Sequence, residues 1–173
     1  IRFGAGVDIG YYDQHQAHLH ENKTVLDEVW DDFHRLDQTE VRGALGLFLF
    51  TGDDVLMPIS TLSGGEKGRV ALTKLMLKKD NVLLLDEPGN HLDLRFQQEL
   101  FLLIDAWRRE PGHAVVSVVH DLSLARKFGT HALLLSSGRG AYGEISAILT
   151  PSALESAWQM DVVGWLRSLG DVW

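Results

Sequence analysis

Residues 62 to 93 read LSGGEKGRVALTKLMLKKDNVLLLDEPGNHLD, and this stretch decides the fold. Ser63 stands directly before a helical pattern of apolar residues, so its side chain can cap a helix. Gly64 and Gly65 leave backbone N–H groups open to an anion at that helix start. The apolar run 82–85 then fits a buried parallel strand. The stretch predicts an α/β fold in which a helix start and a strand end face a ligand.

Two adjacent acids, Asp86 and Glu87, end this strand. Asp86 can hold Mg²⁺ through water, because hard cations take oxygen ligands, and Glu87 can polarise an attacking water. The bland alternative is a capped helix followed by a strand that ends in solvated acids. The succession of both pieces favours phosphate chemistry over that alternative.

These motifs resemble those of a known family. Leu62–Glu66 resembles the signature motif of ATP-binding cassette (ABC) ATPases, residues 82–87 resemble their Walker B strand, and Asn90–Asp93 resembles their D-loop. The resemblance implies an ABC-type P-loop NTPase fold, with a mainly parallel sheet and a small helical insertion. It also implies ATP and Mg²⁺ as ligands, and a second cassette or self-association as partner, since two cassettes of the family enclose two ATP molecules.

The resemblance assigns a role to each matching residue. Asp86 would bind Mg²⁺, Glu87 would act catalytically, and Asp93 would contact nucleotide and couple the two cassettes. The signature residues would contact a nucleotide held by the other cassette; they are Ser63, Gly64, Gly65 and Glu66.

Two more positions match the family at strand ends. Gln14 follows the expected strand 7–12 and resembles the Q-loop glutamine, which contacts Mg²⁺ and nucleotide and reports to the partner. His120 follows the expected buried strand 114–119 and resembles the switch histidine, which contacts the γ-phosphate. The bland alternatives are a polar turn residue for Gln14 and a structural histidine for His120.

The two parts of the chain resemble different groups of the family. Residues 1–93 look like the ABC-F group, soluble proteins that act mainly on the ribosome, whereas residues 94–173 look like the ATPase subunits of importers for metal chelates or cobalamin. Residues from about 15 to 60 take the place of the helical subdomain, and 61–173 carry the signature, Walker B, D-loop, switch histidine and a C-terminal hairpin and helix.

The remaining elements follow from periodicity and capping. We expect a helix over 24–36, capped by Thr24 and with Asp27 and Glu28 in its first turn. Further helices are expected over 40–50, 94–109, 122–128 and 151–159, and a strand over 131–136 that turns at 138–140 into a return strand over 141–143.

The composition of the chain limits the partners and the location that we expect for it. The formal net charge is −8 without a long basic block, so no strong nucleic-acid patch is expected. The chain has no cysteine, and no apolar run approaches the roughly 20 residues that span a bilayer, so direct membrane insertion is not expected. We expect a cytoplasmic protein, peripheral at the inner face of the membrane if a transmembrane permease is its partner.

Three other site types fit less well. Gly4-Ala5-Gly6 lacks the third glycine and the preceding strand of a dinucleotide loop. A cluster of histidines, His15, His18 and His20, lacks a fourth metal ligand and suits a solvated turn. Residues 117–121 offer serine, histidine and aspartate, but neighbours in one strand and turn cannot meet in triad geometry.

The motif G-x-x-x-x-G-K-[ST] does not occur in the 173 residues, so the Walker A part is absent. We expect a single partial nucleotide-binding domain over 1–173, a sheet with one face exposed, and no ATP turnover by this polypeptide alone. Three functional classes stay open: an importer ATPase subunit, a ribosome-associated ABC-F fragment, and a mosaic or engineered fragment without turnover.

Overall fold

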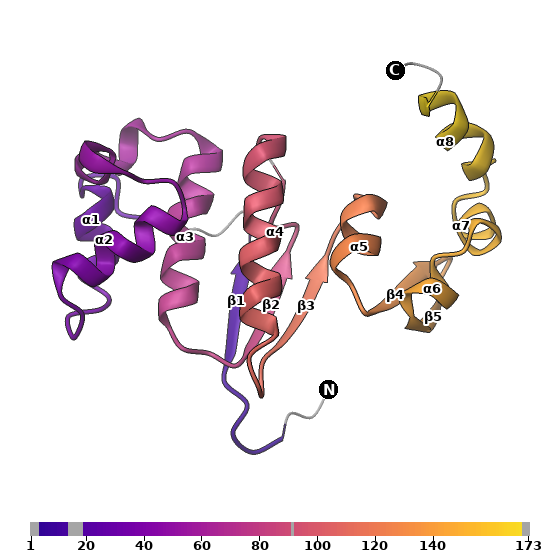
Figure 1. The fold of residues 1–173 in the computed structure, drawn as a ribbon, viewed down its shortest axis with the longest axis horizontal. Coiled ribbons are helices and arrows are strands. Elements are labelled where there is room, and N and C mark those ends of the chain that lie inside the picture. Colours follow the sequence, from indigo (N-terminus) through magenta and orange to yellow (C-terminus); the bar gives the residue numbers. More distant parts are fainter. Residues whose placement is uncertain (1–3, 14–18, 91, 171–173) are drawn as a thin grey trace. The chain divides into compact units, whose positions relative to one another are not determined.

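A computed structural model describes residues 4–13, 19–90 and 92–170. The chain divides into two compact units, residues 1–119 and 120–173. In the first unit the elements run β1 (Ile9–Asp13), α1 (Val25–Trp30), α2 (Gln38–Leu47), two short 3₁₀ helices (Gly52–Leu56 and Ile59–Thr61), α3 (Gly64–Leu77), β2 (Val82–Asp86), α4 (Leu94–Arg108) and β3 (Ala114–Val118) (Figure 1). The single nucleotide-binding domain over 1–173 stays a prediction.

The sheet of the first unit has the order β1-β2-β3, and both pairings are parallel, as predicted. Tyr11 lies beside Leu84, and Leu84 beside Val116, so these three side chains form one row across the sheet. The adjacent rows, which contain Leu83 and Leu85, project on the opposite face, because successive side chains alternate along a strand.

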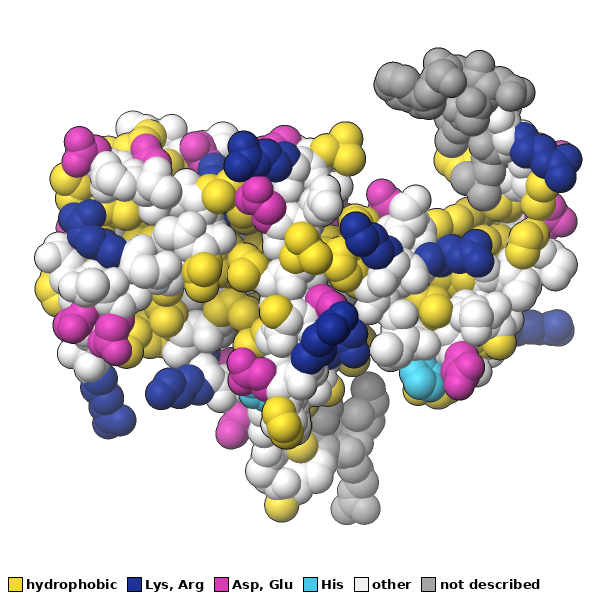
Figure 2. All heavy atoms as spheres, in the orientation of Figure 1, with side chains coloured by type: hydrophobic (Ala, Val, Ile, Leu, Met, Phe, Trp, Pro, Cys, Tyr) yellow, Lys and Arg dark blue, Asp and Glu magenta, His cyan; other side chains and the backbone are white. Residues whose placement is uncertain are grey.

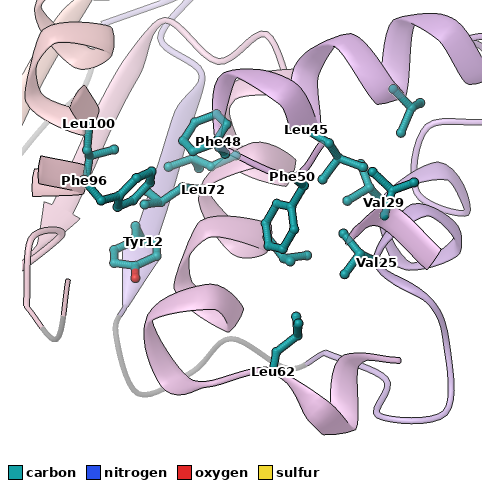
Figure 3. Close-up of a cluster of buried hydrophobic side chains, with 14 of the residues drawn as sticks. Tyr12, Val25, Val29, Leu45, Phe48, Phe50, Leu62, Leu72, Phe96 and Leu100 are labelled. Atoms are coloured by element: carbon teal, nitrogen blue, oxygen red, sulfur yellow. The ribbon is translucent and has the colours of Figure 1, made fainter. Parts of the chain in front are cut away.

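Helices α3 and α4 cover one face of this sheet. Tyr12, Leu83 and Leu85 point to that face and are buried. Figure 3 shows Phe96 and Leu100 of α4 beside Tyr12 and Leu72. The same cluster continues into the helical region, where it includes Val25, Val29, Leu45, Phe48, Phe50 and Leu62. One core therefore holds the sheet, α3, α4 and the helical region together.

The opposite face of the sheet is exposed. Val116 is 61% exposed and Val118 51%, and Tyr11 is also exposed. The prediction of an unbroken buried strand at 114–119 is therefore wrong. The run Ala114–Val119 is apolar on both faces, but β3 is an edge strand of this sheet and only its Val115 side packs against the core.

The helical region between β1 and α3 is shorter in its helices than predicted. Thr24 caps α1 as expected, accepting the Asp27 N–H at 3.1 Å, but α1 ends at Trp30 rather than near Leu36. The chain turns instead, because the Trp30 indole N–H donates to the Leu36 carbonyl at 2.9 Å. The prediction that this helix runs to Leu36 is thus wrong.

Helix α2 begins earlier and ends earlier than the predicted range 40–50. Asp37 caps it, and Asp37 and Glu40 form a capping box with hydrogen bonds of 2.8 Å in both directions. At its end Leu49 has a φ of 64°, and the Phe50 N–H bonds to the Leu45 carbonyl at 3.1 Å. This left-handed residue stops the helix before the predicted end.

The second unit contains α5 (Leu122–Phe128), β4 (His131–Ser136), β5 (Arg139–Glu144), α6 (Ile145–Ile148), α7 (Pro151–Trp158) and α8 (Val162–Gly170). The hairpin β4–β5 is antiparallel, but its turn is Ser137–Gly138, not 138–140 as predicted. Both turn residues have positive φ, 48° and 76°, which suits the twist of a two-residue hairpin loop. Helix α8 was not predicted, although Asp161 accepts the Gly164 N–H at its start.

In the part of the chain that the structure describes, none of the helices combines the length and the apolar character that crossing a membrane requires.

Candidate functional site

The start of α3 is a capped helix terminus, as the sequence predicted. Ser63 accepts the Glu66 N–H at 3.3 Å, and its own N–H donates to Glu66 Oε2 at 2.8 Å. The Ser63 hydroxyl also donates to Glu66 Oε2 at 2.7 Å. The first helical bond runs from the Lys67 N–H to the Ser63 carbonyl at 2.9 Å, so the N–H groups of Gly64 and Gly65 precede the helical ladder. These two N–H groups can donate hydrogen bonds to an external anion.

Glu66 is drawn back into this cap. Its carboxylate receives both bonds from Ser63 and lies 3.5 Å from Arg69. The hydrogen bond from the Ser63 hydroxyl, then that from its backbone N–H, lowers the pKa of Glu66 below its usual value. Glu66 therefore serves the helix start as an ionised capping residue, and its contact with nucleotide stays a prediction.

The carboxyl ends of β1 and β2 carry acids side by side. Asp13 ends β1, Asp86 ends β2, and the two are direct partners in the parallel register. Both point to the same face as Tyr11, two residues before the end of β1. Partial burial, followed by the charges of Asp13 and Asp86, raises the pKa of Tyr11. The negative field of the two carboxylates thus converges at this edge.

Glu87 sits in a constrained turn directly after β2. Its φ is 47°, a left-handed value that is uncommon for a residue with a side chain. The turn is held by hydrogen bonds from the Glu87 N–H to the Val118 carbonyl at 3.1 Å and from the Asn90 N–H to the Glu87 carbonyl at 3.0 Å. The Asn90 amide also donates to Glu87 Oε2 at 2.7 Å. This turn fixes one carboxylate oxygen, and strain of this kind is found at functional sites.

The start of α3 belongs to the same edge of the sheet as the acids. A Cβ placed on Gly68, in the second turn of α3, would lie 3.0 Å from the Tyr12 hydroxyl, near the carboxyl end of β1. A Cβ placed on Gly10 would lie 2.6 Å from Leu75, near the other end of α3. Helix α3 therefore runs antiparallel to β1. Its capped start faces the edge at which Asp13, Asp86 and Glu87 lie.

Asp93 caps the next helix. Its carboxylate accepts the Phe96 N–H at 2.9 Å at the start of α4. The Gln97 amide donates to the Gly89 carbonyl at 2.7 Å and so ties the turn after Glu87 to α4. Asp93 thus lies at the end of the segment that begins with Glu87, and its role in nucleotide contact and coupling stays a prediction.

Two predicted site residues cannot be joined to this edge. Gln14 directly follows Asp13 in the chain, but it lies outside the described residues, as do His15 and His18. His120 is the first residue of the second unit, two residues after β3, and its contact with the γ-phosphate stays a prediction. Asp121, next to it, caps α5 by accepting the Ser123 N–H at 2.7 Å, so its carboxylate is used within its own helix.

The donor set at the edge fits a magnesium–nucleotide complex. Across residues 4–13, 19–90 and 92–170, no cluster of three or more His, Asp or Glu side chains could hold a metal by itself. Mg²⁺ commonly keeps several waters and binds through one or two carboxylates plus substrate phosphates. Asp86, with Asp13 as its direct neighbour, supplies that kind of partial ligand set.

Sequence reasoning missed two groups, one at the site and one in the helical region. Asp13 was overlooked because its importance comes from the register that places it beside Asp86; its position at a strand end was the available signal. Glu28, in α1, was read as an acidic residue of a helix start, but it is buried and contacts both His20 and Lys74. The His20 side chain is 63% exposed and reaches Glu28 from the surface.

A separate apolar surface lies between α2 and α4. Leu47, Leu102 and Leu103, with Glu99, line a shallow pocket there. Figure 2 shows hydrophobic side chains gathered between the helical region and α4 on this face of the first unit.

Comparison with known proteins shows which family the chain resembles over these motifs. The family model described as "ABC transporter" matches residues 4–90. The "Putative ATP-binding protein YdiF" of Bacillus subtilis is 50% identical over 137 residues, which cover 79% of this chain and 21% of that protein. The "Hemin import ATP-binding protein HmuV" of Streptomyces coelicolor is 45% identical over 106 residues, covering 61% of this chain and 34% of that protein. The chain therefore spans only about a fifth to a third of these relatives.

A solved structure gives the fold. The structure titled "An inward-facing conformation of a putative metal-chelate type ABC transporter" superposes with a TM-score of 0.72 at 24% identity, covering 88% of this chain and 64% of that one. This likeness confirms the predicted P-loop NTPase fold of the ABC type.

Proposed function

Because the chain belongs to the ABC transporter family of ATPases, we propose that it supplies the signature helix and the Walker B edge of a composite ATP site. Ser63, Gly64, Gly65 and Glu66 would face a nucleotide held by a second cassette. Asp86 and Glu87, with Gln14 and His120, would serve the site of their own cassette, and Asp93 would couple the two. The partner is a second cassette or a second copy of this chain.

The observation that carries the proposal is the common edge. Helix α3 runs antiparallel to β1, so a capped helix start with two spare N–H groups lies at the sheet edge that carries Asp13, Asp86 and Glu87. N–H groups at a helix start bind phosphate oxygens, and strand-end carboxylates bind the accompanying cation. If the helix cap and the acids were only structural, there would be no reason for them to lie at the same edge of the sheet.

Asp86 and Glu87 have different proposed roles at this edge. Asp86 would hold Mg²⁺, which when bound neutralises charge on the phosphates. Glu87 would hold and orient a water through its carboxylate, because a carboxylate at this strand end can polarise an attacking water. The Asn90 bond to Oε2 and the constrained Glu87 backbone keep this carboxylate in one position.

The 173 residues do not contain the loop that normally cradles the phosphates. That loop provides several charge-assisted hydrogen bonds of about 1.5 to 3 kcal/mol each. Lack of three such bonds weakens binding by about three decades or more, at about 1.4 kcal/mol per decade. We therefore propose that a polypeptide of these residues alone binds ATP weakly and does not turn it over.

Titration of the isotope-labelled polypeptide with MgATP, followed by amide NMR shifts, tests both proposals. We expect small shifts at residues 63–66 and at 86–90 that do not saturate at micromolar ATP. Glu87→Gln should keep these shifts, because it removes the charge that acts on water and leaves the helix start intact. Micromolar, Mg²⁺-dependent binding would refute the weak binding, and shifts confined to other regions would refute the site.

Three settings for this site remain proposals. The likeness to a hemin import ATP-binding protein supports an importer subunit that binds a transmembrane permease, and the apolar surface of Leu47, Leu102 and Leu103 is a candidate contact. The ABC-F character of 1–93 supports a ribosome partner instead, and a non-catalytic mosaic is the third setting. In each, we propose a cytoplasmic location, at the inner membrane face when a permease is bound. Co-sedimentation with purified ribosomes would favour the ribosome partner, and lack of co-sedimentation would count against that setting.

A further inference from the structure

A buried carboxylate joins α1 to the signature helix. Glu28 is 1% exposed, and its Oε1 accepts a hydrogen bond from Lys74 Nζ in α3 at 2.6 Å. Lys74 also pairs with the half-exposed Asp32 at 2.9 Å. Burial lowers the pKa of Lys74, but the bonds and charges of Glu28 and Asp32 outweigh it and leave the pKa raised. Lys74 is therefore charged at neutral pH.

The second oxygen of Glu28 holds a different segment. Glu28 Oε2 accepts the backbone N–H of His20 at 3.2 Å and contacts His20 Nδ1 at 3.0 Å. His20 stands six residues after Gln14, in the segment that leaves the carboxyl end of β1. One side chain thus connects this segment to α3.

Backbone pairing connects the same two regions nearer the signature. The Ile59 N–H donates to the Lys23 carbonyl at 2.9 Å, and the Ser60 N–H donates to the Glu21 carbonyl at 3.2 Å. Residues 21–23 are therefore bound to the segment that enters α3, and Glu28 is bound to Lys74 in the last turn of α3. Because α3 is attached both just before its start and in its last turn, these contacts fix the direction of the helix axis as well as the position of the helix.

Stability alone does not account for this pair. Desolvation of two charges offsets their attraction, so apolar residues of similar volume would pack equally well at such a position. A buried pair does specify one arrangement, because displacement leaves a charge buried without its partner. The arrangement it specifies here is that of α3 against α1 and the segment after β1.

We propose that Glu28 is a positioning residue that sets the direction of α3 and so the place at which Ser63, Gly64 and Gly65 meet a nucleotide. The proposal rests on the proposed function for its consequence, since it concerns how the signature is presented. Lys74 lies eleven residues beyond Ser63, about 16 Å along the helix. A tilt of about 10° around Lys74 would move the helix start by about 3 Å, the length of a hydrogen bond.

The test compares three variants of the full chain by NMR relaxation dispersion at the amides of residues 63–66. Glu28→Gln removes the charge but keeps an oxygen for the His20 N–H, and Glu28→Gln with Lys74→Met removes both charges. Asp32→Asn is the matched control, because it changes the half-exposed partner of the same lysine in the same way. Motion on the microsecond to millisecond scale is what this measurement detects.

We expect shifted amides and new exchange broadening at residues 63–66 in both Glu28 variants, and neither in Asp32→Asn. The double variant covers the case in which Glu28→Gln alone leaves Lys74 too poorly paired to fold. Changes confined to the neighbours of residues 28 and 74, with unaltered amides at 63–66 in folded protein, would overturn the proposal. This readout needs no nucleotide, so failure of the proposed ATP site would leave it standing.

Discussion

Replacing Ser63 by alanine tests the helix start on which the site depends. Alanine removes the hydroxyl that accepts the Glu66 N–H at 3.3 Å and donates to Glu66 Oε2 at 2.7 Å, and keeps the backbone bond of 2.8 Å. Loss of a cap costs about 1 kcal/mol, and loss of an exposed bond to a carboxylate adds about 0.5 to 1 kcal/mol. We expect the free energy of unfolding to fall by about 1.5 to 2 kcal/mol.

Urea unfolding followed by tryptophan fluorescence and circular dichroism measures this loss. Ser63→Thr is the matched control, because it keeps a hydroxyl, and it should stay within about 0.5 kcal/mol of the natural chain. The two units can unfold separately, so coincidence of the two signals must be checked before a single free energy is derived. A loss below about 0.3 kcal/mol in Ser63→Ala would contradict the capping geometry.

The same bond predicts a pH dependence. Because Ser63 lowers the pKa of Glu66 below its usual value of 4.5, the carboxylate stabilises the folded state above that value. This contribution is lost as pH falls through the lower folded pKa. The stability difference between the natural chain and Glu66→Gln should therefore shrink as pH falls from about 6 to about 3. In the Ser63→Ala background it should shrink less, and an equal change in both backgrounds would refute the assignment.

The remaining predictions concern packing and capping, and urea midpoints check each of them. Phe96→Ala should lower the free energy of unfolding by about 3 to 5 kcal/mol, because Phe96 is only 2% exposed in the core. Leu94→Ala should lower it by less than about 0.5 kcal/mol, because Leu94 is 85% exposed. Equal losses in the two variants would contradict the burial of Phe96. Gly10→Ala should lower the free energy of unfolding by about 1 to 3 kcal/mol, because its Cβ would lie 2.6 Å from a leucine methyl of α3. Gly43→Ala, which has open space around it, should instead stabilise α2 by about 0.5 to 1 kcal/mol. Changes of the same sign in the two variants would be inconsistent with this packing. Asp93→Ala should cost about 1 kcal/mol and Asp93→Asn much less, since asparagine also caps helices; a similar loss in both would speak against the cap.

Features set by neighbours in the chain could be predicted from the sequence. Ser63 was expected to cap α3 and Thr24 to cap α1, and both do, because a cap needs only residues three positions apart. The parallel sheet followed from strands that alternate with helices, and the family motifs gave its P-loop NTPase type.

Features set by distant residues could not be predicted. The burial of Glu28 depends on Lys74, which is 46 residues away, and no residue near Glu28 in the sequence indicates that partner. The end of α1 depends on the indole of Trp30 reaching the Leu36 carbonyl, which competes with helix continuation. Val116 looked buried because its strand is apolar throughout, but exposure is decided by what covers a strand.

The pairing of β1 with β2 has a consequence for synthesis of the chain. Asp8 and Asn81, which bond beside the first strand pair, are 73 residues apart in the sequence. At about 5 to 20 residues per second, a ribosome needs roughly 4 to 15 seconds to add that length, far longer than a small helical region needs to fold. The helices between the strands can therefore be complete before β2 emerges. Their packing then shortens the loop that β1 must close and lowers its entropic cost.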